Sequence, residues 1–270
     1  MKRAIFLSTI LLICGAGAVA AHDLFLKPEN FFAAPGTSVS VRVLNGTFTT
    51  SESPVARDRL RDLSLVGPRG MTKVDTALWD TTATASRITL PVGESGTYLL
   101  AASLRHREIT LQAKDFNSYL ASDGVNDVLA ARKRSGELGL AARERYSKHV
   151  KALLQVGAAR SAGFDTPLGY PAELVPLDNP YALGKGKTIR IRALVDGSPV
   201  ANQIVLAGGR TPSGSRISPQ MVRTDAAGVA RVRLATRGAW YVKFIHMARS
   251  RADTTIDYES KWATLTFGVR

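Results

Sequence analysis

The sequence predicts a mainly β protein with two β-sandwich domains, of immunoglobulin or transthyretin-like type, and a helical insert between them. Short stretches of alternating apolar residues, separated by turn signals, fill residues 31–112 and return after residue 174. Between these regions the apolar spacing changes to about 3.6 residues, which is typical of amphipathic helices. We therefore predict an N-terminal domain over 22–112, a helical segment over 113–160 and a C-terminal domain over 170–270.

The first 21 residues have the features of a secretory signal peptide: a basic start, an apolar stretch and small residues at the end. Cleavage after Ala20 or after Ala21 fits this pattern, and the second would make His22 the first residue of the mature protein. The apolar stretch of the signal is too short for a membrane-spanning helix, and no later apolar run approaches the roughly 20 residues that such a helix needs. We expect a soluble periplasmic protein with no integral membrane segment once the signal is removed.

The N-terminal domain begins with clear strand patterns. Valines at positions 39, 41 and 43 alternate with polar residues, and Asn45-Gly46 is a strong hairpin signal. Further strand-like runs lie at residues 63–66, 87–90 and 97–101. We therefore predict that the N-terminal domain contains an antiparallel sheet with one face buried.

The helical segment is predicted from residues that share a face at helical spacing. A break at residues 136–139 separates its two parts. The apolar residues of the shared faces are Phe116, Tyr119, Leu120, Val125, Val128 and Leu129 before the break, and Tyr146, Val150, Leu153 and Leu154 after it. Small residues at 157–169 then form a connector between the domains.

The C-terminal domain again shows the two-residue period of strands. Ile189, Ile191 and Ala193 alternate with arginines, and Asp196-Gly197 marks a turn. Further strands are expected at residues 204–206, 229–234, 240–245 and 262–269. Regularly spaced short strands with such turns favour a second sandwich.

Composition and motifs exclude several functions. The chain has 36 Lys and Arg against 22 Asp and Glu, but these basic residues are scattered and form no nucleic-acid-binding motif. The run Gly186-Lys187-Thr188 lacks the first glycine of a phosphate-binding loop, and no nucleophile-elbow serine is present. We expect neither a nucleic-acid partner nor an enzyme.

The four histidines differ in their surroundings. His106 lies between two arginines, which favours a surface strand, and His149 lies in the predicted helical segment without a histidine or carboxylate four residues later. His246 ends the strong strand pattern of residues 240–245, and strand ends commonly carry functional residues. His22 follows the signal peptide directly.

Three parts of the chain resemble the domain-of-unknown-function 4198 family, whose members are often labelled periplasmic components of cobalt or nickel uptake. The similar segments are residues 21–28, then 116–120 with 144–153 and 173–181, and finally 238–247 with 257–267. His22 and His246 both fall on positions that match the family. The resemblance implies a transition metal as ligand and a membrane metal-uptake transporter as partner.

These residues suggest a metal site. The α-amine and ring of a terminal His22, together with the His246 ring, would give three nitrogen donors, which suit nickel or copper better than magnesium or calcium. Asp257 or Glu259 would add an oxygen ligand or orient a histidine. We therefore expect a periplasmic metal-binding accessory or carrier protein in nickel or cobalt uptake.

Three alternatives remain open at this point. His22 and His246 would simply cap two strands in a metal-free β-sandwich interaction module that binds an envelope partner or a glycan. A copper-dependent oxidase built on a terminal histidine is a further alternative. Asp257 and Glu259 would suit a glycosidase only if their separation in space were right, which sequence does not fix.

Overall fold

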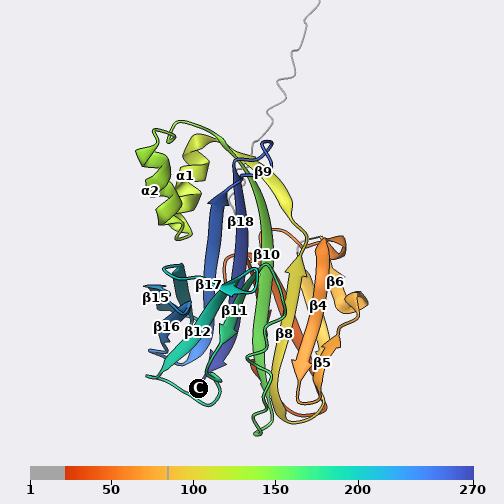
Figure 1. Cartoon of the computed structure of the whole chain (residues 1–270). Coiled ribbons are helices and arrows are strands. Elements are labelled where there is room, and N and C mark those ends of the chain that lie inside the picture. The colour runs from red at the N-terminus through yellow and green to blue at the C-terminus, as the bar shows by residue number, and fades with distance from the viewer. Residues whose placement is uncertain (1–21, 84) are drawn as a thin grey trace, which may run out of the picture.

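The computed structural model describes residues 22–83 and 85–270, so the expected signal peptide lies outside the described residues. The described part of the chain is mainly β, as predicted, and forms three sheets and two α-helices (Figure 1). Short 3-10 turns lie at Arg57–Arg59 and Thr76–Leu78. We call the sheets the central, the N-terminal and the C-terminal sheet.

The central sheet has ten strands and joins the two halves of the chain. Eight of its strands follow one another in the order β15 (Arg216–Arg223), β14 (Ile204–Arg210), β17 (Gly238–Arg249), β18 (Tyr258–Val269), β10 (Ala142–Val156), β8 (Gly96–Leu104), β4 (Leu60–Gly67) and β5 (Gly70–Lys73). The other two, β2 (Phe32–Ala33) and β9 (Arg107–Leu111), also pair with β10. Strands β10 and β18 run parallel and lie side by side in Figure 1. The link between the two halves is therefore a continuous hydrogen-bonded sheet.

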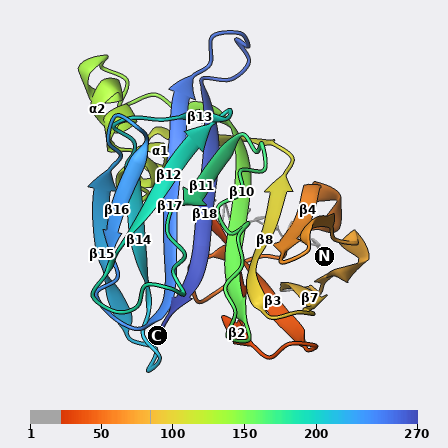
Figure 2. The same cartoon turned by 60° about the horizontal axis from the view of Figure 1, so that its bottom comes forward.

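Each smaller sheet has four strands and covers one face of the central sheet. The N-terminal sheet contains β1 (Asp23–Pro28), β3 (Ser38–Gly46), β7 (Ser86–Pro91) and β6 (Trp79–Thr81), and the C-terminal sheet contains β11 (Ala172–Pro176), β12 (Thr188–Val195), β13 (Ser198–Pro199) and β16 (Val229–Arg233). Within β10, Val150, Ala152 and Leu154 pack toward the N-terminal sheet, and Leu153 packs toward the C-terminal sheet. Because strand side chains alternate, the two sheets lie on opposite faces of β10; Figure 2 shows β11 and β12 lying over the central strands.

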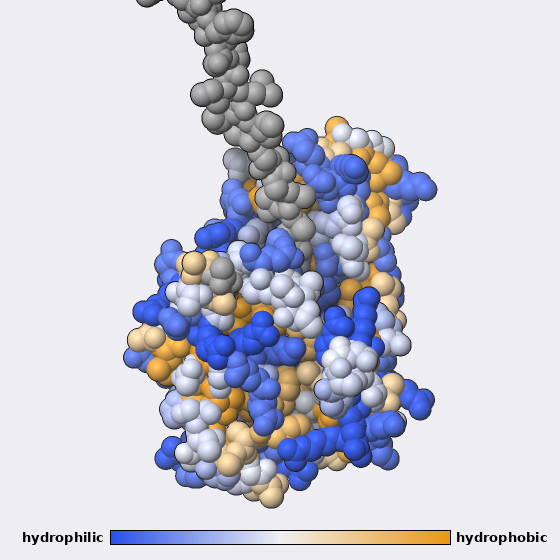
Figure 3. All heavy atoms as spheres, turned by 180° about the vertical axis from the view of Figure 1, so that it is seen from behind, coloured by the Kyte–Doolittle hydropathy of each residue, from blue (hydrophilic) through white to orange (hydrophobic). Residues whose placement is uncertain are grey.

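Two helices, α1 (Ala113–Ser122) and α2 (Asn126–Arg134), lie at one end of the central sheet. Phe116, Tyr119 and Leu120 of α1 pack with Ile245 and Trp262 of the central sheet. None of the described helices is long and apolar enough to cross a membrane. Seen from behind, hydrophilic residues are spread over the surface with smaller hydrophobic patches between them (Figure 3).

The expected helical segment is correct only in its first part. Residues 142–156 form the strand β10, so the prediction of a helix through Tyr146, Val150 and Leu154 is wrong, and His149 lies in a strand. Every residue from Lys148 to Val156 is buried. A strand covered on both faces loses its two-residue period, so its apolar run is indistinguishable from that of a helix.

Candidate functional site

His22 is held at two points, although it precedes the first strand. Its ring atom Nε2 contacts the Glu52 carboxylate, and its backbone carbonyl accepts a hydrogen bond from Lys148 Nζ. Glu52 lies in the loop that follows β3, and Lys148 lies in the middle of β10. The ring and the backbone of His22 are therefore both fixed by residues that are distant in sequence.

A group of buried charges lies next to His22. Lys243 Nζ of β17 contacts Asp23 Oδ2 at 2.6 Å and Asp123 Oδ1 at 2.8 Å. Burial opposes the charge of Lys243, but the attraction of Asp23 and Asp123 raises its pKa above the ordinary value. The second carboxylate oxygen of Asp23, Oδ1, is buried and has no hydrogen-bond partner within the described residues. Burial raises the pKa of Asp23, against the attraction of Lys243.

Lys148 is the second buried lysine of this group. Its ammonium nitrogen lies 5.1 Å from the centre of the Trp262 ring and 5.4 Å from that of Tyr146. Burial lowers the pKa of Lys148 to about 8, and the attraction of Asp23 only partly offsets this effect. Glu144, buried on the same face of β10, accepts a hydrogen bond from Tyr119 Oη at 3.1 Å.

A cavity of about 640 Å³ opens beside these residues. His22, Asp23, Glu52, Asp123 and Lys243 line one part of it, and we call this part the histidine end. Its other walls come from β14, β15 and β17, with Arg210, Arg216 and Tyr241 among the lining residues. The cavity is large enough to admit a small organic molecule.

His246 lies in a different place. Side chains alternate along β17, so His246 and Lys243 point to opposite faces of the central sheet. His246 Nδ1 lies 3.0 Å from Gln203 Oε1, and the residue lines a separate cavity of about 230 Å³ that His22 does not reach. Burial, reinforced by repulsion from Lys261, lowers the pKa of His246. The structure does not bring His22 and His246 together.

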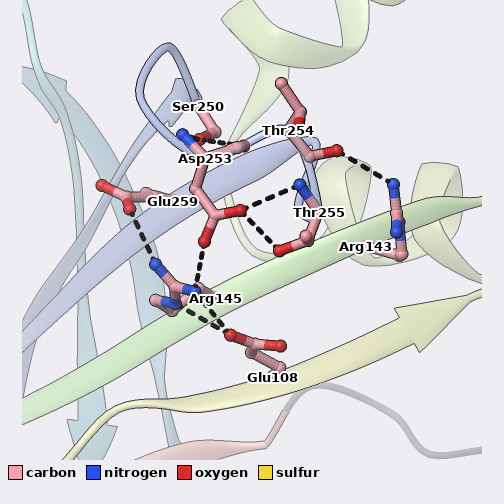
Figure 4. Close-up of polar contacts among 8 residues, drawn as sticks. All are labelled: Glu108, Arg143, Arg145, Ser250, Asp253, Thr254, Thr255 and Glu259. Carbon is pink, nitrogen blue, oxygen red and sulfur yellow. Dashed lines mark hydrogen bonds and ion pairs between the residues drawn. The ribbon is translucent and has the colours of Figure 1, made fainter.

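Glu259 belongs to an arginine network beside the loop that joins β17 and β18 (Figure 4), and Asp257 lies at the end of that loop. Asp257 Oδ2 accepts a hydrogen bond from the backbone N–H of Arg143 at 2.7 Å, and Glu259 contacts the Arg145 guanidinium at 3.5 Å. Arg145 also contacts Glu108 at 2.7 Å and Asp253 at 2.6 Å. These two expected ligands are thus directed at arginines.

The remaining two histidines do not complete a site. His106 is exposed between β8 and β9, and His149 is buried, with Nδ1 2.9 Å from Ser103 Oγ. Burial lowers the pKa of His149 to about 3, so its ring is neutral at neutral pH. Across residues 22–83 and 85–270, no three His, Cys, Asp or Glu side chains converge to form a metal site.

The sequence singled out His22 as a candidate but not the charged residues that surround it. Lys243 gave the clearest signal, since it interrupts the apolar strand pattern of residues 240–245 and therefore needed a buried partner. Glu52 and Asp123 gave no such signal, because their contacts with His22 and Lys243 are formed only by the folded chain.

One protein-family model matches most of the chain. The model described as "Domain of unknown function (DUF4198)" matches residues 19–248. The matched residues include His22 and His246 and end before Asp257 and Glu259. No curated protein matches the chain.

Proposed function

The chain belongs to the domain-of-unknown-function 4198 family, and because that description names no activity, we propose a function from the site itself. We propose a periplasmic metal-binding accessory or carrier protein in nickel or cobalt uptake, with His22 as the metal-binding residue. In this proposal the signal peptide is cut after Ala21, and the partner is a membrane metal-uptake transporter. The protein binds and transfers its cargo and catalyses no reaction.

The double fixation of His22 is the observation that supports this proposal. A carboxylate that accepts a hydrogen bond from Nε2 favours the tautomer with a free lone pair on Nδ1, and such carboxylates commonly orient metal-binding histidines. Glu52 is placed for this role. Once the bond before His22 is cut, Nδ1 and the new α-amine belong to one residue and can chelate one ion.

The donor set fits the metals that we propose. Two nitrogen donors with nearby carboxylate oxygens suit Ni(II), Co(II) or Cu(II) better than Mg(II) or Ca(II). Asp23 supplies a buried carboxylate oxygen without a hydrogen-bond partner in the described part of the chain. Metal affinity falls as the pH is lowered, because protons compete for the amine and the imidazole.

His246, Asp257 and Glu259 are outside the site that we propose. The His246 ring is on the opposite face of the central sheet, and both carboxylates are engaged by arginines. A metal that used Asp257 or Glu259 would have to displace these arginine contacts. The site that we propose therefore consists of His22 and the carboxylates around it.

Titration calorimetry with Ni(II), Co(II) and Cu(II) tests this function. The protein must begin at His22, as verified by mass, and His246→Ala is the matched control for His22→Ala. We expect His22→Ala to lose at least about tenfold in affinity, which corresponds to about 1.4 kcal/mol, while His246→Ala binds like the unaltered protein. Absence of binding by the unaltered protein would reject the metal carrier in favour of a metal-free interaction module.

A further inference from the structure

Two arginines lie on adjacent strands in the wall of the cavity, and neither has a counter-ion among the described residues. Arg210 ends β14, and its direct partner in the β14–β15 ladder is Arg216. Like charges at directly opposed positions destabilise a sheet. Neither guanidinium forms an ion pair with a carboxylate of the described residues.

Another opposed arginine pair shows what is missing. In the C-terminal sheet, Arg190 of β12 lies opposite Arg231 of β16. There Asp178 supplies the opposite charge, with Oδ1 2.6 Å from Arg190 Nη2. Arg210 and Arg216 are likewise directly opposed, but no carboxylate of the described residues pairs with either of them, and both line the cavity.

More positive charge lies behind this pair. Lys27 of β1 is directly opposite Arg42 of β3. Burial lowers the pKa of Lys27, and repulsion from Arg42 and Arg210 lowers it further. Among the described residues, Lys27 Nζ contacts the Phe48 carbonyl, at 3.1 Å, and the face of the Phe48 ring. We call Arg210 and Arg216 the basic end of the cavity; Lys27 and Arg42 do not line it but add positive charge close to it.

The basic end and the histidine end are joined along β14. Leu206 of β14 is paired with Lys243, and Arg210 lies four residues farther along the strand. At about 3.3 Å per residue, the two ends are about 13 Å apart. Tyr241 lies between them, and its ring crosses Gly208, where a Cβ atom would come within 2.7 Å of Tyr241 Oη. The cavity therefore has one end suited to a cation and another suited to an anion.

We infer that this cavity binds a small organic polycarboxylate against Arg210 and Arg216. Guanidinium groups bind carboxylates through paired hydrogen bonds, so two opposed arginines match a molecule with two or more carboxylates. The length and volume of the cavity exceed those of a single inorganic anion. A second step rests on the proposed function of metal binding at His22. In that step the metal reaches His22 as its complex with the polycarboxylate.

Calorimetry on metal-free protein tests the anion site, with citrate, tricarballylate and inorganic phosphate as probes. We expect citrate and tricarballylate to bind, and the double variant R210Q/R216Q to weaken both at least tenfold. R231Q is the matched control and should leave binding unchanged. The double variant should also keep or raise its melting temperature, because it removes a repulsion. Phosphate binding as tight as citrate binding, or citrate binding that survives the double variant, would overturn the inference.

The two proposals fail in different ways. His22→Ala should lose Ni(II) and keep citrate, whereas R210Q/R216Q should lose citrate and keep Ni(II). Native mass spectrometry with preformed nickel citrate should then show protein, metal and anion in a single ternary complex. Ni(II) binding without any polycarboxylate binding would overturn the anion site alone. Citrate binding without Ni(II) binding would support the anion site and reject the metal carrier.

Discussion

Two clusters of charged residues lie on opposite faces of the central sheet and differ in how completely their charged atoms find partners. The cluster around Arg145 is half exposed, and the arginine satisfies three carboxylates, from Glu108, Asp253 and Glu259. The cluster around Lys243 is nearly buried, yet it leaves Asp23 Oδ1 without a partner among the described residues and borders a cavity. Both contain the same kinds of side chain.

The difference separates a structural cluster from a candidate binding site. Exposed ion pairs with complete partners mainly fix local geometry, as the Arg145 network does for the β17–β18 hairpin (Figure 4). Buried charges with an unsatisfied oxygen beside a cavity are energetically costly, and such arrangements are typical of functional sites. This contrast leads us to place the function at His22 and not at Asp257 and Glu259.

The largest effect is expected from Lys243→Met. This change leaves Asp23 and Asp123 buried without their counter-ion, and removing one partner of a buried ion pair costs about 3–5 kcal/mol of stability. The side chain of Lys243 is only 7% exposed, so little solvent screening remains. Urea unfolding at neutral pH measures the loss. A loss of less than about 1 kcal/mol in the free energy of unfolding would mean that the two carboxylates are better solvated than their burial indicates.

A pH-dependent effect is expected from Lys148. Because its pKa is lowered from 10.5 to about 8, the unfolded chain holds this proton more tightly than the folded protein does. The contribution of Lys148 to stability therefore rises as the pH increases from about 8 to 10.5, by an amount on the order of 3 kcal/mol.

The measurement compares the unfolding free energies of the unaltered protein and Lys148→Met across this pH range. The difference between them should change with pH in the stated direction, and effects of other titrating groups cancel. A difference that stays constant from pH 8 to pH 10.5 would show that Lys148 keeps its ordinary pKa.

The β character could be predicted from the sequence, and His22 could be singled out as a candidate, for identifiable reasons. Alternating residues such as Ile189 and Ile191 have one buried face, which a single sequence can show. Strand β10 was missed because two sheets cover both of its faces, and this removes the alternation. The contact between His22 and Glu52 spans 30 positions and depends on how β1 pairs with β3, so no local pattern encodes it.

The smallest effect is expected from Glu259→Gln in the Arg145 network. Arg145 keeps Glu108 and Asp253, and the Glu259 side chain is 47% exposed, so water replaces the lost contact. We expect no more than about a quarter of the Lys243→Met effect on the free energy of unfolding. Metal affinity should not change. A clear loss of metal affinity would show that Glu259 takes part in the metal site.

Electron paramagnetic resonance of bound Cu(II) tests the placement of the metal site at His22 most directly. The protein beginning at His22 should show nitrogen coordination from one imidazole and one amine. This spectrum should be unchanged in His246→Ala and lost in His22→Ala. A spectrum that changes in His246→Ala and persists in His22→Ala would contradict the placement.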